Sequence, residues 1–156
     1  MALLSIVCLT YAQKGSNPFM QEWKTPYGVP PFDKIKNEHY IPAFEAGMKQ
    51  QVAEIKAIVS NKQTPNFDNT ILALENSGQL LYRVSSVFFN LLECSNSPEM
   101  EKIATDIYPK LSQHGDDISL NPKLFARVKV VYENRNSLNL NPEQLRLLQE
   151  TYNGFV

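Results

Sequence analysis

The stretch from Phe67 to Cys94 constrains the fold more than any other part of the chain. Its apolar residues recur at steps of three and four, with Gly78 in the one gap, and this is the spacing of a helical face. Further apolar residues widen that face, so the helix must be covered on several sides. We therefore predict that this stretch is the central helix of a helical assembly. Its apolar residues are Phe67, Ile71, Leu72, Leu74, Leu80, Leu81, Val84, Val87, Phe88, Phe89, Leu91 and Leu92.

The same periodicity predicts four more helices. One runs over residues 39–60. The three others begin after Ser97, Asn121 and Asn141, each of which can cap a helix and is followed by a proline, a favoured first residue of a helix. Pro109 lies inside the apolar pattern that follows Ser97, and it predicts a kink or two shorter helices. The inward-facing residues are predicted to be Phe44, Met48, Val52, Ile55 and Val59, then Met100, Ile103, Ile107, Leu111, His114 and Ile118, then Leu124, Val128 and Val131, then Leu145, Leu148, Tyr152 and Phe155.

No stretch alternates with a period of two, so the predicted fold class is all-α. We expect a bundle of about five mostly antiparallel helices, because short turns join them, and a Pro-rich extended arm before it. The predicted division is a signal-peptide remnant over residues 1–12, an arm over 13–38 and a helical domain over 39–156. At 156 residues the chain fits one domain or a piece of a larger one.

Residues 2–12 form an apolar run of the length of a signal-peptide core, far below the ~20 residues that cross a bilayer. Small residues at Thr10 and Ala12 suit a signal peptidase, although a basic segment before the run is missing. We therefore expect an exported protein, periplasmic or secreted, with no membrane association after signal removal. The alternative is a short buried N-terminal segment.

Residues 13–38 contain four prolines, so they cannot form a regular helix. Aromatic residues are interspersed with these prolines, whereas a free linker is more polar. We predict an arm that packs over its own domain, in preference to a Pro-rich ligand for another protein.

The last predicted helix keeps its apolar face up to Phe155 and Val156. We interpret this as truncation of a longer structure. Apolar side chains around Leu148, Tyr152 and Phe155 are then expected to be exposed and to favour self-association.

Charge and cysteine content exclude several classes of function. The net charge is −1, so nothing indicates electrostatic capture of nucleic acid or of an anionic membrane. The two cysteines, Cys8 and Cys94, are too few for a disulfide framework and lack the paired spacing of a structural zinc site.

Catalytic patterns are equally sparse. The chain has two histidines, and neither belongs to a His-Glu-x-x-His sequence. Glu38 and His39 lie at the start of a predicted helix, where a cap is the commoner role. The run His114, Gly115, Asp116, Asp117 could hold a metal, but a histidine on an apolar face is more often structural. We therefore predict no catalytic, cofactor-binding or metal-binding residue in this chain.

Four segments together resemble a known family: residues 30–48 (PPFDKIKNEHYIPAFEAGM), 67–78 (FDNTILALENSG), 83–91 (RVSSVFFNL) and 120–148 (LNPKLFARVKVVYENRNSLNLNPEQLRLL). They resemble the N-terminal helical region of the thimet-oligopeptidase-like (M3 family) zinc metallopeptidases, and most of all the bacterial dipeptidyl carboxypeptidases. The similarity runs in collinear order from Asn17 to Val156.

The resemblance implies a much longer, almost wholly helical parent enzyme whose two halves enclose a channel. In that family zinc is bound by a His-Glu-x-x-His helix in the C-terminal half, outside the matched region, and the similar members remove C-terminal dipeptides from short peptides. This chain would then be a non-catalytic, inactive portion that forms one wall of the channel. Its implied partners are the catalytic C-terminal half of the same polypeptide and short peptide substrates; some family members are cytoplasmic.

Two other readings remain open. One is a free-standing helical module that binds a peptide or a protein without catalysis. The other is a small hydrolase that uses His114 with Asp116 or Asp117, for which a third metal ligand is lacking.

Overall fold

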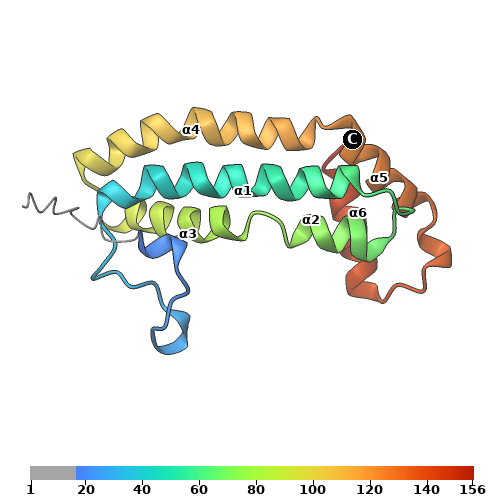
Figure 1. Ribbon diagram of the computed structural model, residues 1–156, viewed down its shortest axis with the longest axis horizontal. Helices are drawn as coiled ribbons and strands as arrows, with labels where there is room; N and C mark the ends of the chain where they lie inside the picture. Colours follow the sequence, from blue (N-terminus) through green and yellow to red (C-terminus); the bar gives the residue numbers. More distant parts are fainter. Residues whose placement is uncertain (1–16) are drawn as a thin grey trace, which may run out of the picture.

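The structure is a computed structural model that describes residues 17–156, and within this range it contains helices and turns but no strand (Figure 1). The all-α prediction is confirmed. The expected signal-peptide remnant over residues 1–12, and residues 13–16 of the arm, lie outside the described residues. No helix within 17–156 is long and apolar enough to cross a membrane.

The described part of the arm is a chain of short turns. Single 3₁₀ turns form at Pro18–Met20 and Asn37–His39, and Pro26–Gly28 is a tight turn in which Tyr27 and Gly28 have positive φ. Phe19, from the first turn, is fully buried in the core of the bundle. The arm therefore packs over its own domain, as predicted from its interspersed aromatic residues.

Helix α1 (Tyr40–Ser60) is the centre of the bundle. It contacts α2, α3, α4 and α5, and Figure 1 shows it between α4 on one side and α2 with α3 on the other. The prediction that residues 67–94 form the central helix is wrong. Helix α1 can occupy the centre because Gly47, which has no side chain, lets α3 approach closely at Leu81.

Residues 67–94 also do not form one helix. A π-helix, Phe67–Leu72, continues into α2 (Ala73–Glu75), and a turn separates α2 from α3 (Gln79–Cys94). The break lies at Gly78, whose φ of +72° is in the left-handed region and whose N–H donates to Glu54 Oε2 at 2.7 Å. A residue with a side chain is strained at this φ, so glycine permits the change of direction.

Helix α4 (Pro98–Ser119) continues through Pro109, so the alternative of two shorter helices is wrong. Its inner face is the predicted one, since Met100, Ile107 and His114 are buried. The long helices α1, α3 and α4 alternate in direction along the chain, as expected, and α1 and α4 consequently run parallel (Figure 1).

Helices α5 (Pro122–Glu133) and α6 (Pro142–Asn153) pack together at the end of the bundle away from the arm (Figure 1). Their predicted caps form, because Asn121 Oδ1 accepts from the Leu124 N–H and Asn141 Oδ1 from the Gln144 N–H. Leu148 is fully buried, so the expectation that its region is exposed is wrong for that residue. Three predicted inward residues are instead exposed: Val52, Leu72 and Leu145.

The core has an apolar part at each end of the bundle. One part joins the arm, α1, α3 and α4 around Phe19, Tyr40, Phe44 and Phe88. At the other end, α1, the π-helix, α5 and α6 contribute two clusters, whose buried members are Phe67, Ile71, Val128, Val131 and Leu148, and Ile55, Ile58 and Leu124. Between the two ends, the polar side chains of Gln51, Ser77 and His114 form hydrogen bonds with one another.

Candidate functional site

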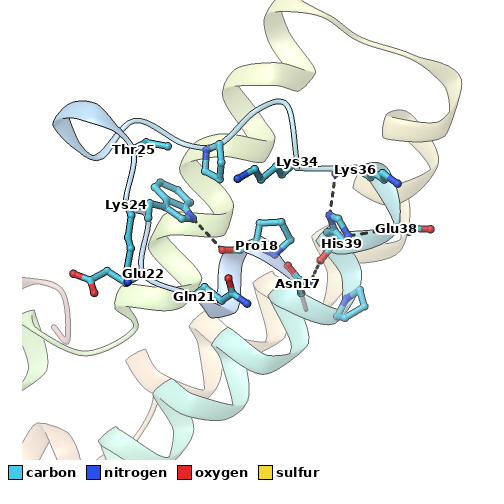
Figure 2. A pocket seen from close by; sticks show the side chains of 13 residues that line it. Asn17, Pro18, Gln21, Glu22, Lys24, Thr25, Lys34, Lys36, Glu38 and His39 are labelled. Atoms are coloured by element: carbon cyan, nitrogen blue, oxygen red, sulfur yellow. Dashed lines mark hydrogen bonds and ion pairs between the residues drawn. The ribbon is translucent and has the colours of Figure 1, made fainter. Parts of the chain in front are cut away.

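A pocket of about 1040 Å³ lies between the arm and the start of α1 (Figure 2). Prolines and one tryptophan supply its apolar surface, while amides and charged side chains supply the rest. The lining residues that carry the argument are Trp23, Lys24, Lys34, Lys36, Glu38 and His39. Sequence reasoning did not predict this pocket, because it is formed by residues at both ends of the arm.

Both ends of the arm are held in place by hydrogen bonds and ring contacts. Asn17 Nδ2 donates to the His39 carbonyl at 2.8 Å, and this bond joins the beginning of the described arm to its end (Figure 2). The ring of Phe19 lies 5.6 Å from that of Tyr40 and 6.2 Å from that of Trp23. These contacts fix the two walls of the pocket relative to α1.

Trp23 is fixed from two sides. Its Nε1–H donates to the Pro18 carbonyl at 3.0 Å (Figure 2), and the Arg83 guanidinium lies 5.4 Å from the ring centroid. Arg83 also donates to the Gln21 carbonyl at 3.0 Å, so α3 anchors the arm directly. Trp23 therefore contributes a preformed aromatic surface to the pocket.

His39 acts as a local cap. Its Nδ1 accepts from the Lys36 N–H at 3.0 Å, and its Nε2 lies 3.9 Å from Glu38 Oε1 (Figure 2). The Nδ1 atom thus caps the turn that leads into α1, which agrees with the capping interpretation of His39, whereas residues 17–156 contain no capping hydrogen bond that involves the Glu38 side chain. The pocket supplies groups that can bind a short extended chain: lysine ammonium groups, amides and a tryptophan face.

The second candidate cluster, around His114, is not brought together as a ligand set. His114 is buried and its Nε2 lies 2.7 Å from Gln51 Oε1. Burial lowers the pKa of His114, and the nearby Asp117 carboxylate opposes this shift. Asp117 Oδ1 accepts from Gln113 on its own helix, and Asp116 is exposed.

Gln51 extends this contact into a polar layer across the middle of the bundle. Its Nε2 donates to Ser77 Oγ at 3.2 Å, beside the bond from Gly78 to Glu54. His114 is therefore a structural residue that links α4 to α1. Among residues 17–156, no three His, Cys, Asp or Glu side chains lie close enough together to hold a metal ion.

The arrangement of residues 17–156 is that of a helical scaffold with an arm pocket, and sequence similarity assigns this scaffold to a class of peptidases. No protein-family model matches the chain. It is 46% identical over 140 residues to dipeptidyl carboxypeptidase of Escherichia coli K12, and 43% identical over 141 residues to dipeptidyl carboxypeptidase of Salmonella typhimurium LT2. Oligopeptidase A of Salmonella typhimurium LT2 is 23% identical over 140 residues. Each similarity covers 90% of this chain.

The chain belongs to the family of dipeptidyl carboxypeptidase and oligopeptidase A, as its resemblance to the thimet-oligopeptidase-like peptidases implied. It spans 21% of the length of the two dipeptidyl carboxypeptidases and 20% of that oligopeptidase A.

Proposed function

We propose that the chain is the N-terminal, non-catalytic portion of a zinc-dependent peptidyl-dipeptidase, an enzyme that removes C-terminal dipeptides from short peptides. The observation that carries this proposal is the 46% identity to a dipeptidyl carboxypeptidase over 90% of the chain. In the proposed enzyme these helices form one wall of the substrate channel and limit entry to short, extended peptides.

Rigid packing supports the role of a wall. Helices α1 and α3 approach so closely that a Cβ at Gly47 would meet the Leu81 backbone. Apolar clusters at both ends of the bundle pack the helices together, and a close-packed core favours a surface that would keep its shape when peptides enter.

Residues 17–156 do not fit the zinc ion that the family implies. His39 is engaged in capping, and His114 is bonded to Gln51 and lacks two further ligands within the described residues. Zinc would be bound by residues of the parent enzyme outside this chain, where it would activate the water that attacks the peptide bond.

The test is dipeptide release from a peptide of at least three residues with a blocked N-terminus. The assay compares the 156-residue chain with the longer polypeptide encoded by the complete reading frame, both with added zinc. Release by the longer polypeptide alone, abolished by a chelator, is the expected result. Chelator-sensitive release by the 156-residue chain would contradict the proposal and would direct attention to His114 and its acidic neighbours.

One observation favours a second candidate, a peptide-binding module without catalysis. Trp23, the single tryptophan of the chain, lines the arm pocket, so its fluorescence reports directly on binding there. A saturable change in emission when short peptides are added to the 156-residue chain would favour this candidate. Trp23→Phe removes the signal and serves as the control.

We also propose export of the protein to the periplasm or the exterior, with cleavage after Ala12. N-terminal sequencing of the protein purified from its own cells tests this proposal. A mature N-terminus at Gln13 would support it, whereas an intact N-terminal segment on a cytoplasmic protein would contradict it.

A further inference from the structure

The segment Pro26–Phe32, which we call the arm tip, projects away from the helices (Figure 1). It carries three exposed apolar side chains, with relative exposures of 103% for Tyr27, 48% for Val29 and 51% for Phe32. Large apolar groups in water are unfavourable when they are grouped, and such groups commonly mark interaction surfaces.

The backbone of the arm tip is ordered by a hydrogen-bonded double turn. The Gly28 N–H donates to the Thr25 carbonyl at 3.1 Å, and the Val29 N–H donates to the Pro26 carbonyl at 3.3 Å. The Thr25 hydroxyl also donates to the Val29 carbonyl. The side chains at the tip are therefore presented by a preformed loop.

Tyr27 occupies a position that normally requires glycine. Its φ of 58° and ψ of 15° lie in the left-handed region, at the third residue of the turn from Thr25 to Gly28, where a positive φ favours glycine or asparagine. A tyrosine there is strained, because its Cβ crowds the backbone. Its ring is fully exposed and makes no ring contact within residues 17–156. The described part of the chain therefore gives no reason for a tyrosine at this turn.

An exposed tyrosine on a hydrogen-bonded loop that also carries other exposed apolar side chains is typical of a residue that anchors an interface. We propose that the arm tip docks, with Tyr27 as its anchor, into an apolar pocket of the longer polypeptide outside this chain. This inference rests on the proposed function. The occupant follows from length, since the chain matches only 21% of the dipeptidyl carboxypeptidases, and most of each relative lies outside the matched region.

The first test is the rate of nitration of each tyrosine by tetranitromethane, measured by mass spectrometry. In the 156-residue chain, Tyr27 should react as fast as tyrosine in an unstructured peptide. In the polypeptide from the complete reading frame it should react at least about tenfold more slowly, because a buried ring is protected. Tyr82, which is 72% exposed on α3, is followed in the same samples as a reference. Equal rates for Tyr27 in both proteins would overturn the proposal.

The second test is the variant Tyr27→Gly, which removes the ring and relieves the strain. It should raise the melting temperature of the 156-residue chain by up to about 2–4 °C, because relief of the strain should exceed the entropy that glycine adds to the unfolded chain. In the longer polypeptide the same variant should lower the melting temperature, because the docking contact is lost. A rise in both proteins would overturn the proposal, and a fall in the 156-residue chain would show that Tyr27 already has a partner within that chain.

These results are distinguishable from failure of the proposed function. Absence of dipeptide release by the wild-type longer polypeptide contradicts the proposed function, whatever the state of Tyr27. Normal release together with an unprotected Tyr27 contradicts the docking proposal alone. Protection that develops only when a competitive peptide is added would assign Tyr27 to the substrate and would also overturn the docking proposal.

Discussion

Gly47 in α1 lies directly against the backbone of Leu81 in α3: a Cβ at Gly47 would be 2.8 Å from the Leu81 Cα. The Cβ atom of a residue does not approach a backbone this closely. The two helices can therefore cross here only because residue 47 is glycine, which has no Cβ. This crossing sets the separation of α1 and α3 along their length.

Gly47→Ala should therefore destabilise the chain, although alanine favours a helix more than glycine does. We expect a loss of about 1–3 kcal/mol in the free energy of unfolding, because α3 must move away from α1. Urea unfolding followed by circular dichroism measures the loss. Gly115→Ala in α4 is the matched control: no atom lies within 4 Å of its added Cβ, so this variant should gain roughly 0.5–1 kcal/mol. Equal effects of the two variants would contradict the close crossing.

His114 should make stability depend on pH. Burial lowers its pKa below the ordinary value of 6.5, so the folded chain binds fewer protons than the unfolded chain between those two pKa values. Stability is then fully present above pH 6.5 and falls as the pH is lowered from 6.5 toward the pKa of the folded state. His114→Gln should flatten this dependence in urea titrations at a series of pH values.

Asp117→Asn provides the opposite control. The carboxylate of Asp117 raises the pKa of His114, so its removal should lower that pKa further and enlarge the loss of stability below pH 6.5. A smaller loss in this variant would show that the Asp117 carboxylate does not raise the pKa of His114.

Arg127 connects α5 to the π-helix through a buried guanidinium group. Its Nη atoms donate to the Asn61 carbonyl at 2.8 Å, to Asn69 Oδ1 at 3.0 Å and to Thr70 Oγ1 at 3.3 Å, while its Nε has no hydrogen-bond partner among residues 17–156. Arg127→Met should cost about 2–3 kcal/mol, because several buried acceptors lose charged donors.

The control for Arg127 lies on the same helix. Lys129 is half-exposed and forms an ion pair with Glu133 at 3.7 Å, so Lys129→Met should change stability by less than about 1 kcal/mol. Denaturant unfolding of both variants gives the comparison. A loss as large for Lys129→Met as for Arg127→Met would mean that the buried bonds of Arg127 add little.

Phe19 should determine whether the arm stays on the bundle. Its side chain is fully buried, and Phe19→Ala removes the ring that packs on Tyr40, at an expected cost of about 3 kcal/mol. The released arm should be cleaved by trypsin at Lys24 at least about tenfold faster than in the wild-type chain. Phe32→Ala, at an exposed position of the same arm, should leave the cleavage rate unchanged.

The parts of the fold that were predictable from the sequence are those set by local chemistry. The caps at Ser97, Asn121 and Asn141 form because a short polar side chain reaches backbone N–H groups two or three residues later. The inner face of α4 was predictable because burial follows the helical period. The arm was predictable in outline, since Phe19 had to find an apolar surface.

The missed features depend on residues far apart in the sequence. The broad apolar face of residues 67–94 suggested that they form the central helix. Helix α1 is central instead, through its small residues and the hydrogen bonds of Gln51, and a count of hydrophobic residues detects neither. The break at Gly78 is stabilised by Glu54, 24 positions earlier. The arm pocket likewise depends on Arg83, 62 positions from the carbonyl of Gln21 that it binds.

The polar layer formed by Gln51, Ser77 and His114 separates the two apolar ends of the core, and the long helices α1 and α4 each pack into both ends. Opening one end therefore need not expose the apolar surface of the other, so amide hydrogen exchange should divide the chain into two groups with different protection. We expect the two ends to behave as separate cooperative folding units that are coupled through α1 and α4. Stress applied to either end of the bundle would then reach the other along these two helices.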